Sequence, residues 1–291
     1  MSPNRSPSPG EPLLRVERVS KYFQRDGGRF AAVEDVSLEL HAGQTLGVVG
    51  ESGSGKSTLS RCIIRLYEPD EGRVWFNGGD FTALKPRALR EQRKNMQMIF
   101  QDPLASLNPM MTVMQAIADP LLIHGLGTSR HRAKRAAELM ELVGLDAAAA
   151  NAFPFEFSGG QQQRIAIARA LALNPRLLIC DEAVSALDVS IQAQILRLLQ
   201  DLQKQLGLAY LFISHNLAVV EHMSDQIAVM YGGKVVESAP TAEIFRSPQQ
   251  EYTRMLIASV PMIPRRPPGI GNRESGIGSE AGGRLSVASG R

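Results

Sequence analysis

The segment GESGSGKST, from Gly50 to Thr58, constrains the fold of this chain more than any other feature of the sequence. It follows the short apolar run 44–50, which is typical of a strand buried on both faces, and it opens a predicted helix. Glycines at this spacing let successive backbone N–H groups turn inward, where they form an anion cradle with the helix N-terminus. The sequence therefore predicts a phosphate-binding loop within an α/β domain.

Two side chains of the loop extend this prediction from an anion to a nucleotide. Lys56 can reach the β- and γ-phosphates, and Ser57 can supply one oxygen to Mg²⁺. The alternative interpretation is a glycine-rich surface turn, which leaves the flanking strand and helix unexplained. We therefore expect a Mg²⁺–nucleotide site.

Polar residues at the ends of two other apolar runs fit the same site. Asp181 and Glu182 directly follow the predicted strand 176–180, and His215 directly follows the strand 208–214. The carboxyl ends of strands are where open α/β sheets bind ligands. Asp181 is expected to bind Mg²⁺ through water, Glu182 to orient and polarise the attacking water, and His215 to contact the γ-phosphate. An acidic pair alone more often ends a strand at the surface, so the phosphate loop is what favours the catalytic interpretation.

The ends of the chain differ in composition from its body. Residues 1–12 and 261–291 are rich in Pro, Gly and Ser, and we expect both to be disordered tails around a globular region, 13–260. In that region, 13–23 and 31–40 alternate apolar and polar residues, as half-buried antiparallel strands do. The body therefore begins with an antiparallel β subdomain.

The later part of the body predicts helices first and then an alternation. Residues 102–157 read as an inserted helical subdomain, in which the helix 111–126 is interrupted by Pro120. From residue 158 onward, helices alternate with apolar strands, which predicts a parallel sheet with helices on its faces. A last helix is expected near 241–259.

Charge, aromatic content and cysteines exclude several classes. The net charge of +3 comes from residues 261–291, which contain five arginines and two glutamates. Aromatic residues are 5% of the chain. A neutral body with few aromatics predicts no nucleic-acid partner. Cys62 and Cys180 exclude a disulfide framework or a four-thiolate metal site and are expected to be buried. No apolar run approaches the ~18–20 residues that span a bilayer, so we expect a soluble cytoplasmic protein whose membrane role depends on a partner.

A further motif connects these residues to a known family. FSGGQQQR, residues 157–164, lies between the phosphate loop and LLICDE, and it resembles the signature motif of ATP-binding cassette (ABC) ATPases. The resemblance spans about 13–260 and implies an α/β fold: a P-loop NTPase core with a mostly parallel sheet flanked by helices, an N-terminal antiparallel β subdomain and an inserted α-helical subdomain.

The resemblance also assigns roles to residues. It implies that Tyr22 stacks on adenine, that Gln101 is a catalytic glutamine and Mg²⁺ ligand, and that Asp188 belongs to the D-loop. The expected ATP-binding loop comprises Gly50, Glu51, Ser52, Gly53, Ser54, Gly55, Lys56, Ser57 and Thr58, the metal ligands are Ser57, Gln101 and Asp181, and the signature is Ser158, Gly159, Gly160 and Gln161.

Three longer segments, 98–109, 186–216 and 247–261, resemble the subunits that drive bacterial import of dipeptides, oligopeptides or nickel. Two residues depart from the wider family: Ala183 stands where Pro usually follows the catalytic Glu, and Asn216 stands where Asp commonly follows the His. Neither residue is a phosphate or water ligand, so tuned rather than abolished turnover is expected.

The implied mechanism involves a second chain. If the helical subdomain lies between the signature and this chain's own loop, the two cannot meet within one chain. The resemblance implies that the signature closes on ATP held by a second ABC ATPase subunit, identical or similar. The resemblance further implies transmembrane permease subunits, an indirect link to an extracytoplasmic solute-binding protein, and a peripheral position on the cytoplasmic face of the plasma (inner) membrane. Alternatives are an exporter or another importer ATPase, a non-transport ABC ATPase of translation or DNA repair, and a regulatory module without turnover.

Overall fold

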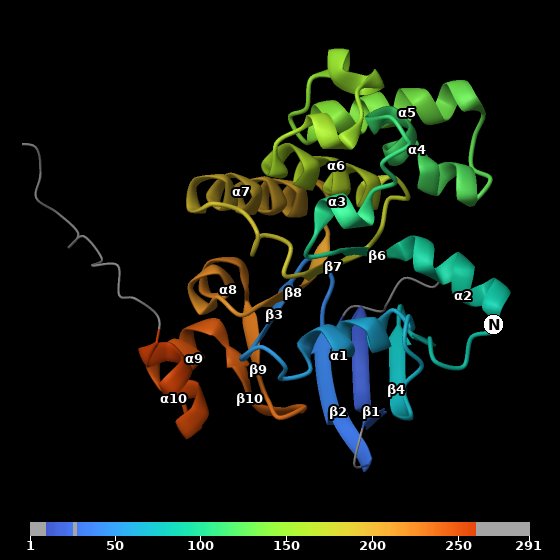
Figure 1. Ribbon diagram of the computed structural model, residues 1–291. Coiled ribbons are helices and arrows are strands. Elements are labelled where there is room, and N and C mark those ends of the chain that lie inside the picture. The colour runs from blue at the N-terminus through green and yellow to red at the C-terminus, as the bar shows by residue number, and fades with distance from the viewer. Residues whose placement is uncertain (1–9, 26–27, 260–291) are drawn as a thin grey trace, which may run out of the picture. The chain divides into compact units, whose positions relative to one another are not determined.

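The computed structural model describes residues 10–25 and 28–259 (Figure 1). The expected disordered tails, 1–12 and 261–291, lie outside the described residues except for residues 10–12. In the described part, no helix is both long and apolar enough to cross a membrane.

The first sheet is antiparallel, as the alternating segments predict. Its strand order is β2-β1-β4-β5. The strands are β1 (Leu14–Arg25), β2 (Gly28–Leu40), β4 (Glu71–Phe76) and β5 (Gly79–Asp80). Leu14 faces Leu40 on one side and Phe76 on the other, and all three side chains are buried. One face of this sheet is therefore turned toward a core.

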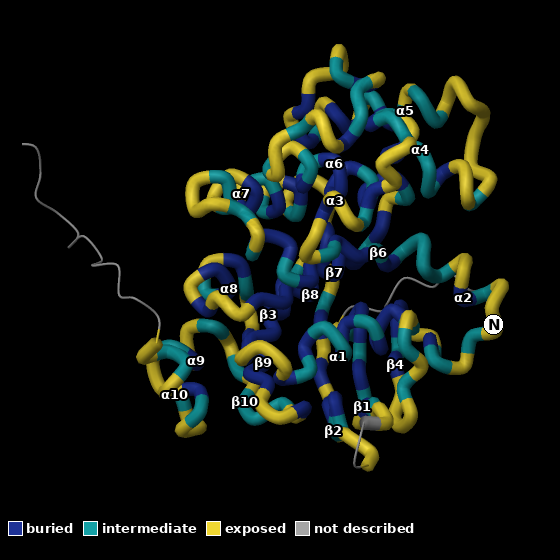
Figure 2. Tube along the Cα trace, viewed as in Figure 1, coloured by how far each residue is buried: buried dark blue, intermediate teal, exposed yellow. Residues whose placement is uncertain are grey.

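The second sheet contains the strands that lead into the predicted site. Its order is β10-β9-β3-β8-β7-β6, parallel from β9 to β6, with β10 antiparallel to β9. The strands are β3 (Thr45–Val49), β6 (Met96–Ile99), β7 (Leu177–Asp181), β8 (Ala209–Ser214), β9 (Gln226–Tyr231) and β10 (Lys234–Pro240). Every residue of β3, β7 and β8 is buried, which accounts for their continuous apolar sequences (Figure 2). The carboxyl ends of β3, β8 and β7 lie side by side, so the three segments that follow them start at one edge.

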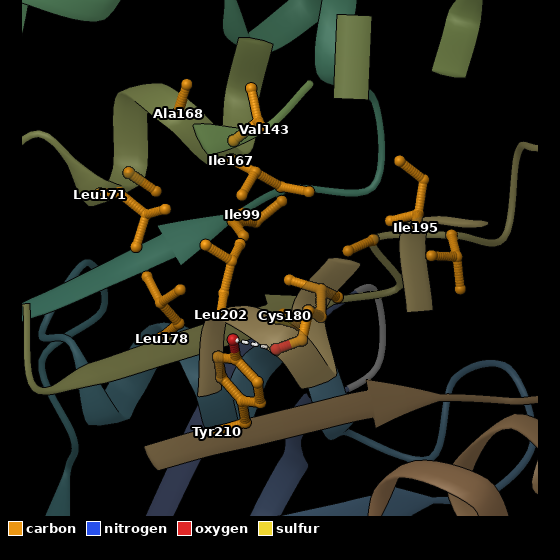
Figure 3. Packing of buried hydrophobic residues seen from close by; sticks show 14 of the residues in the cluster. Ile99, Val143, Ile167, Ala168, Leu171, Leu178, Cys180, Ile195, Leu202 and Tyr210 are labelled. Carbon is orange, nitrogen blue, oxygen red and sulfur yellow. Dashed lines mark hydrogen bonds between the residues drawn. The ribbon is translucent and has the colours of Figure 1, made fainter. Parts of the chain in front are cut away.

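The parallel sheet separates two cores. Helix α1 (Lys56–Ile63) buries Leu59, Cys62 and Ile63 against the antiparallel sheet. On the other side, α6 (Gly159–Leu171) and α7 (Val189–Leu206) pack with the inserted helices (Figure 1). Figure 3 shows this second core, in which the Tyr210 hydroxyl donates to the Leu199 carbonyl at 2.7 Å.

The insert is helical, but one expectation about it was wrong. It contains α3 (Pro103–Ser106), α4 (Val113–Ile123), α5 (Ser129–Leu142) and the 3₁₀ turns η2 (Ala147–Asn151) and η3 (Pro154–Glu156). Pro120 does not interrupt α4, which continues through it. A proline removes one backbone hydrogen bond, but the capping box of Thr112 and Gln115 fixes the start of α4, and its buried face holds the helix against the core.

The last predicted helix, near 241–259, is two helices in the structure. These are α9 (Thr241–Arg246) and α10 (Glu251–Ala258), and Pro248 lies between them. The residue before a proline is disfavoured in the helical region, and Ser247 ends α9 with a ψ of 62°. Three further elements, α2 (Pro86–Gln92), the turn η1 (Arg93–Asn95) and α8 (Leu217–Met223), were not predicted from the sequence.

Candidate active site

The phosphate loop joins β3 to α1, as the sequence predicts. At Gly50 the φ angle is 153°, and an added Cβ would lie 2.2 Å from the Met230 carbonyl oxygen. No side chain fits in that space, so the close contact between the loop and β9 requires glycine at this position.

Lys56 is held within the loop. Its Nζ donates to the carbonyl oxygens of Gly50 at 2.8 Å and Glu51 at 2.7 Å, and to the Ser54 hydroxyl at 3.3 Å. Burial lowers the pKa of Lys56, while the carboxylates of Glu182 and Asp181 act in the opposite direction. All three ammonium protons therefore have acceptors inside the loop.

The three expected metal ligands line a single hollow of ≈ 420 Å³. Ser57 enters it from α1, Gln101 from the segment after β6, and Asp181 from the end of β7. The Ser57 hydroxyl donates to Asp181 Oδ1 at 2.8 Å. Burial raises the pKa of Asp181, and the hydrogen bond from Ser57 opposes that shift. Hydroxyl, amide and carboxylate oxygens are the donors that Mg²⁺ prefers, so this donor set fits the ion.

The loop after β7 brings Glu182 and His215 together. The Glu182 N–H donates to the Ile213 carbonyl oxygen at 3.0 Å, and Glu182 Oε2 lies 3.2 Å from His215 Nδ1. Glu182 has a φ of 51°, a region that residues other than glycine seldom occupy. Such backbone strain gathers at functional sites when the surrounding structure fixes it. Here the hydrogen bond to β8 fixes the backbone of the residue expected to position the water.

The signature residues lie at the start of α6. Ser158 is its N-cap, and its hydroxyl accepts from the Gln161 N–H while Gln161 Oε1 accepts from the Ser158 N–H. A Cβ on Gly160 would lie 2.5 Å from Ile191 Cγ2, so the glycine lets α6 pack closely on α7. Ser158, Gly159 and Gln161 are exposed.

Asp188 forms the N-cap of α7. Its Oδ1 accepts from the N–H groups of Ser190 at 3.1 Å and Ile191 at 3.0 Å. Hydrogen bonds to the Asp188 carboxylate lower its pKa, and the bond from the Ile191 N–H has the largest effect. Because Ile191 also meets Gly160, the signature and the D-loop form one packed unit. This unit belongs to the core on the opposite side of the parallel sheet from α1.

Two arginines at the site were not found from the sequence. The Arg29 guanidinium lies 3.7 Å from the ring centroid of Tyr22, so it covers part of the ring expected to stack on adenine. Arg61 lines the Ser57–Asp181 hollow. Arg61 could have been predicted from the sequence, because it lies four residues after Ser57 on one helix and so on the same helix face. Arg29 could not, because it contacts Tyr22 across a pair of strands.

Comparison with known proteins agrees with this fold. The sequence profile of the family described as ABC transporter matches residues 33–185. The chain belongs to this family, and it is an ATP-hydrolysing cassette of the ABC type.

Among relatives, the oligopeptide transport ATP-binding protein OppF of Bacillus subtilis is 52% identical over 254 residues, which are 87% of this chain and 83% of that protein. The glutathione import ATP-binding protein GsiA of Escherichia coli is also 52% identical, over 260 residues, but the chain spans 42% of GsiA. The dimeric post-hydrolysis structure of the cassette MJ0796, bound to ADP and Pi, has a TM-score of 0.72 and 30% identity over 79% of this chain and 99% of that one. The predicted fold class and family are thus confirmed.

Proposed function

We propose that this chain hydrolyses Mg²⁺–ATP to drive import of peptides through membrane permease subunits. One observation supports the hydrolytic role. The phosphate loop, the Ser57–Asp181 contact and the Glu182–His215 contact all lie at one edge of the parallel sheet. Peptide-sized cargo is supported by the match to OppF across 83% of its length. GsiA supports the same cargo class, since glutathione is a small peptide.

The residues divide the reaction between them. Lys56 and the N–H groups of the loop hold the β- and γ-phosphates, and Tyr22 contacts the adenine. Glu182 orients the attacking water, and His215, positioned by its contact with Glu182, holds the γ-phosphate. A Mg²⁺ ion held by Ser57, Asp181 and Gln101 would neutralise phosphate charge. Phosphoryl transfer depends mainly on positioning and charge, which these side chains supply.

A second subunit completes each site. The signature residues Ser158, Gly159, Gly160 and Gln161, of which all but Gly160 are exposed, would bind ATP held by the other chain. Asp188 would lie at the same interface. Val189, directly after Asp188, is 82% exposed, as expected of an apolar residue that a partner covers. ABC cassettes work as dimers with membrane permease components, and MJ0796 is dimeric. We infer a partner that is a second copy of this chain or a similar ABC ATPase.

The same proposal sets the location. With permease subunits as its attachment, the chain would lie peripherally on the cytoplasmic face of the plasma (inner) membrane. An extracytoplasmic solute-binding protein would deliver the peptide and would meet this chain only through the permease. Substrate choice would then depend on those other subunits.

The direct test is to isolate tagged Glu182→Gln protein from detergent-solubilised membranes in Mg²⁺–ATP and to identify what co-purifies. Loss of the water-positioning carboxylate should slow hydrolysis about 10²- to 10⁴-fold and so trap the assembly. Multi-span permease subunits with an ABC ATPase are the expected result, and Glu243→Gln, an exposed carboxylate far along the chain on α9, is the control that should hydrolyse normally. Recovery of ribosomes or DNA instead would contradict the importer function.

A further inference from the structure

One residue to which the sequence assigns no role in the nucleotide site bonds directly to the phosphate loop. The Glu51 N–H donates to the Tyr252 hydroxyl at 3.0 Å, although the two residues lie 201 positions apart. Tyr252 belongs to α10, the last helix of the described chain. The Tyr252 hydroxyl, near the end of the described chain, therefore contacts the backbone at the start of the phosphate loop.

Helix α10 is fixed in place by the neighbouring strand. Glu237 of β10 accepts from the Gln249 N–H at 2.8 Å through Oε1 and from the Gln250 N–H at 3.0 Å through Oε2. Burial raises the pKa of Glu237, but hydrogen bonds, that from Gln249 first, together with the charge of Arg254 hold the pKa below its usual value. An ionised carboxylate at a helix N-terminus is favourable. The position of Tyr252 is thus set by β10, which pairs through β9 with β3, the strand that enters the loop.

A second contact joins the β9–β10 strand pair to the phosphate loop. The Gly233 N–H, in the turn between β9 and β10, donates to the Ser54 carbonyl oxygen at 3.1 Å. Tyr231, at the end of β9, packs against the Tyr252 ring with a centroid distance of 4.4 Å. Burial raises the pKa of Tyr252, so its hydroxyl stays protonated at neutral pH. The loop is consequently held at two points, near its start and near its middle.

We propose that Tyr252 is a positioning residue for nucleotide binding, through which α10 holds the phosphate loop in its binding conformation. The inference rests on the proposed nucleotide site. A loop whose shape is fixed before binding loses less conformational freedom when the ligand arrives, and its affinity is higher for that reason. Tyr252 would act through the Glu51 backbone and not through contact with the phosphates.

The test compares Tyr252→Phe with Tyr231→Phe in the full chain. The first removes the hydroxyl that bonds Glu51 and keeps the ring. The second removes the hydroxyl of the neighbouring ring, which has no hydrogen bond to another described residue. One hydrogen bond predicts that Tyr252→Phe weakens binding of a fluorescent ADP analogue by about two- to tenfold and raises the ATP KM equally. We expect kcat to stay within about twofold, and Tyr231→Phe to bind like the wild type.

Amide exchange at Glu51 separates positioning from general stability. If Tyr252 holds the loop, exchange at the Glu51 N–H accelerates in Tyr252→Phe, while the melting temperature changes little. Unchanged affinity and KM in Tyr252→Phe, with or without a lower melting temperature, would overturn the inference but leave the nucleotide site standing. A wild-type chain that binds no nucleotide would overturn the proposed site itself.

Discussion

The edge that holds the phosphate loop and the unit that holds the signature use their polar groups differently. At the loop, side chains from separate elements contact one another: Ser57 bonds Asp181, and Glu182 meets His215. In the signature unit, Ser158 and Asp188 each cap their own helix, and both remain exposed. We therefore expect the first region to bind a nucleotide by itself, and the second to present an exposed surface to a partner subunit. Nucleotide binding and hydrolysis should therefore be separable by mutation.

The largest expected effect belongs to the loop. Lys56→Ala removes a cation that bonds three groups of the loop, so the chain should lose detectable nucleotide binding and, with it, hydrolysis. Equilibrium binding of a fluorescent ATP analogue measures this. Lys204→Ala removes an exposed lysine of α7 and is the matched control. If Lys56→Ala bound ATP with normal affinity, the loop would not be the phosphate site.

A signature substitution should divide the two activities. Ser158→Arg places a long cation on the exposed surface of α6, so ATP hydrolysis should be lost while the isolated chain binds nucleotide normally. Ser158→Thr keeps a hydroxyl that can cap α6, so it should retain the fold and most activity. Steady-state hydrolysis and binding are measured on the same preparations. Hydrolysis that survives Ser158→Arg would mean that one chain is catalytically complete.

A smaller effect is expected at the adenine. Stacking of a base on an aromatic side chain contributes about 1–3 kcal/mol, so Tyr22→Ala should weaken ATP affinity by about tenfold with little effect on kcat. Tyr22→Phe, which keeps the ring and its contact with Arg29, should bind like the wild type. Unchanged affinity in the alanine variant would favour Phe23 as the stacking residue, or no stacking at all.

The smallest effect concerns one cysteine in each core. Cys62 lies in the core under α1, and Cys180 in the core under the signature helix. Burial raises the pKa of both thiols to about 12, so neither should react with a thiol reagent at pH 8 until the chain unfolds. Both thiols should then become reactive over the same range of denaturant concentration. Early reaction of one thiol would show that its core opens independently of the other.

The two regions also differ in how much the sequence could predict. The phosphate loop and the signature are contiguous, and each carries its own helix start, so their local structure follows from the spacing of glycines and capping residues. The meeting of Ser57 with Asp181, 124 residues apart, follows from one rule: the parallel strands of one sheet, here β3 and β7 on either side of β8, end at the same edge. The fold class needed no more than this rule and the alternation of elements.

Other features depend on contacts that no local pattern encodes. Pro120 lies inside α4 because tertiary packing of the helix outweighs one lost hydrogen bond. Tyr252 reaches Glu51 only because β10 fixes α10, and Arg29 covers Tyr22 only because β1 and β2 pair in one register. By contrast, the break between α9 and α10 had a local signal at Pro248, which the prediction of one helix near 241–259 did not use.

The measurement that tests the central claim most directly is the molar mass of Glu182→Gln in solution, determined by light scattering with and without Mg²⁺–ATP. If the loop of one chain pairs with the signature of another, ATP should convert the protein from monomer to dimer. Ser158→Arg in the same background should remain monomeric while still binding ATP. A wild-type chain that hydrolyses ATP while Glu182→Gln stays monomeric at saturating Mg²⁺–ATP would contradict the shared site.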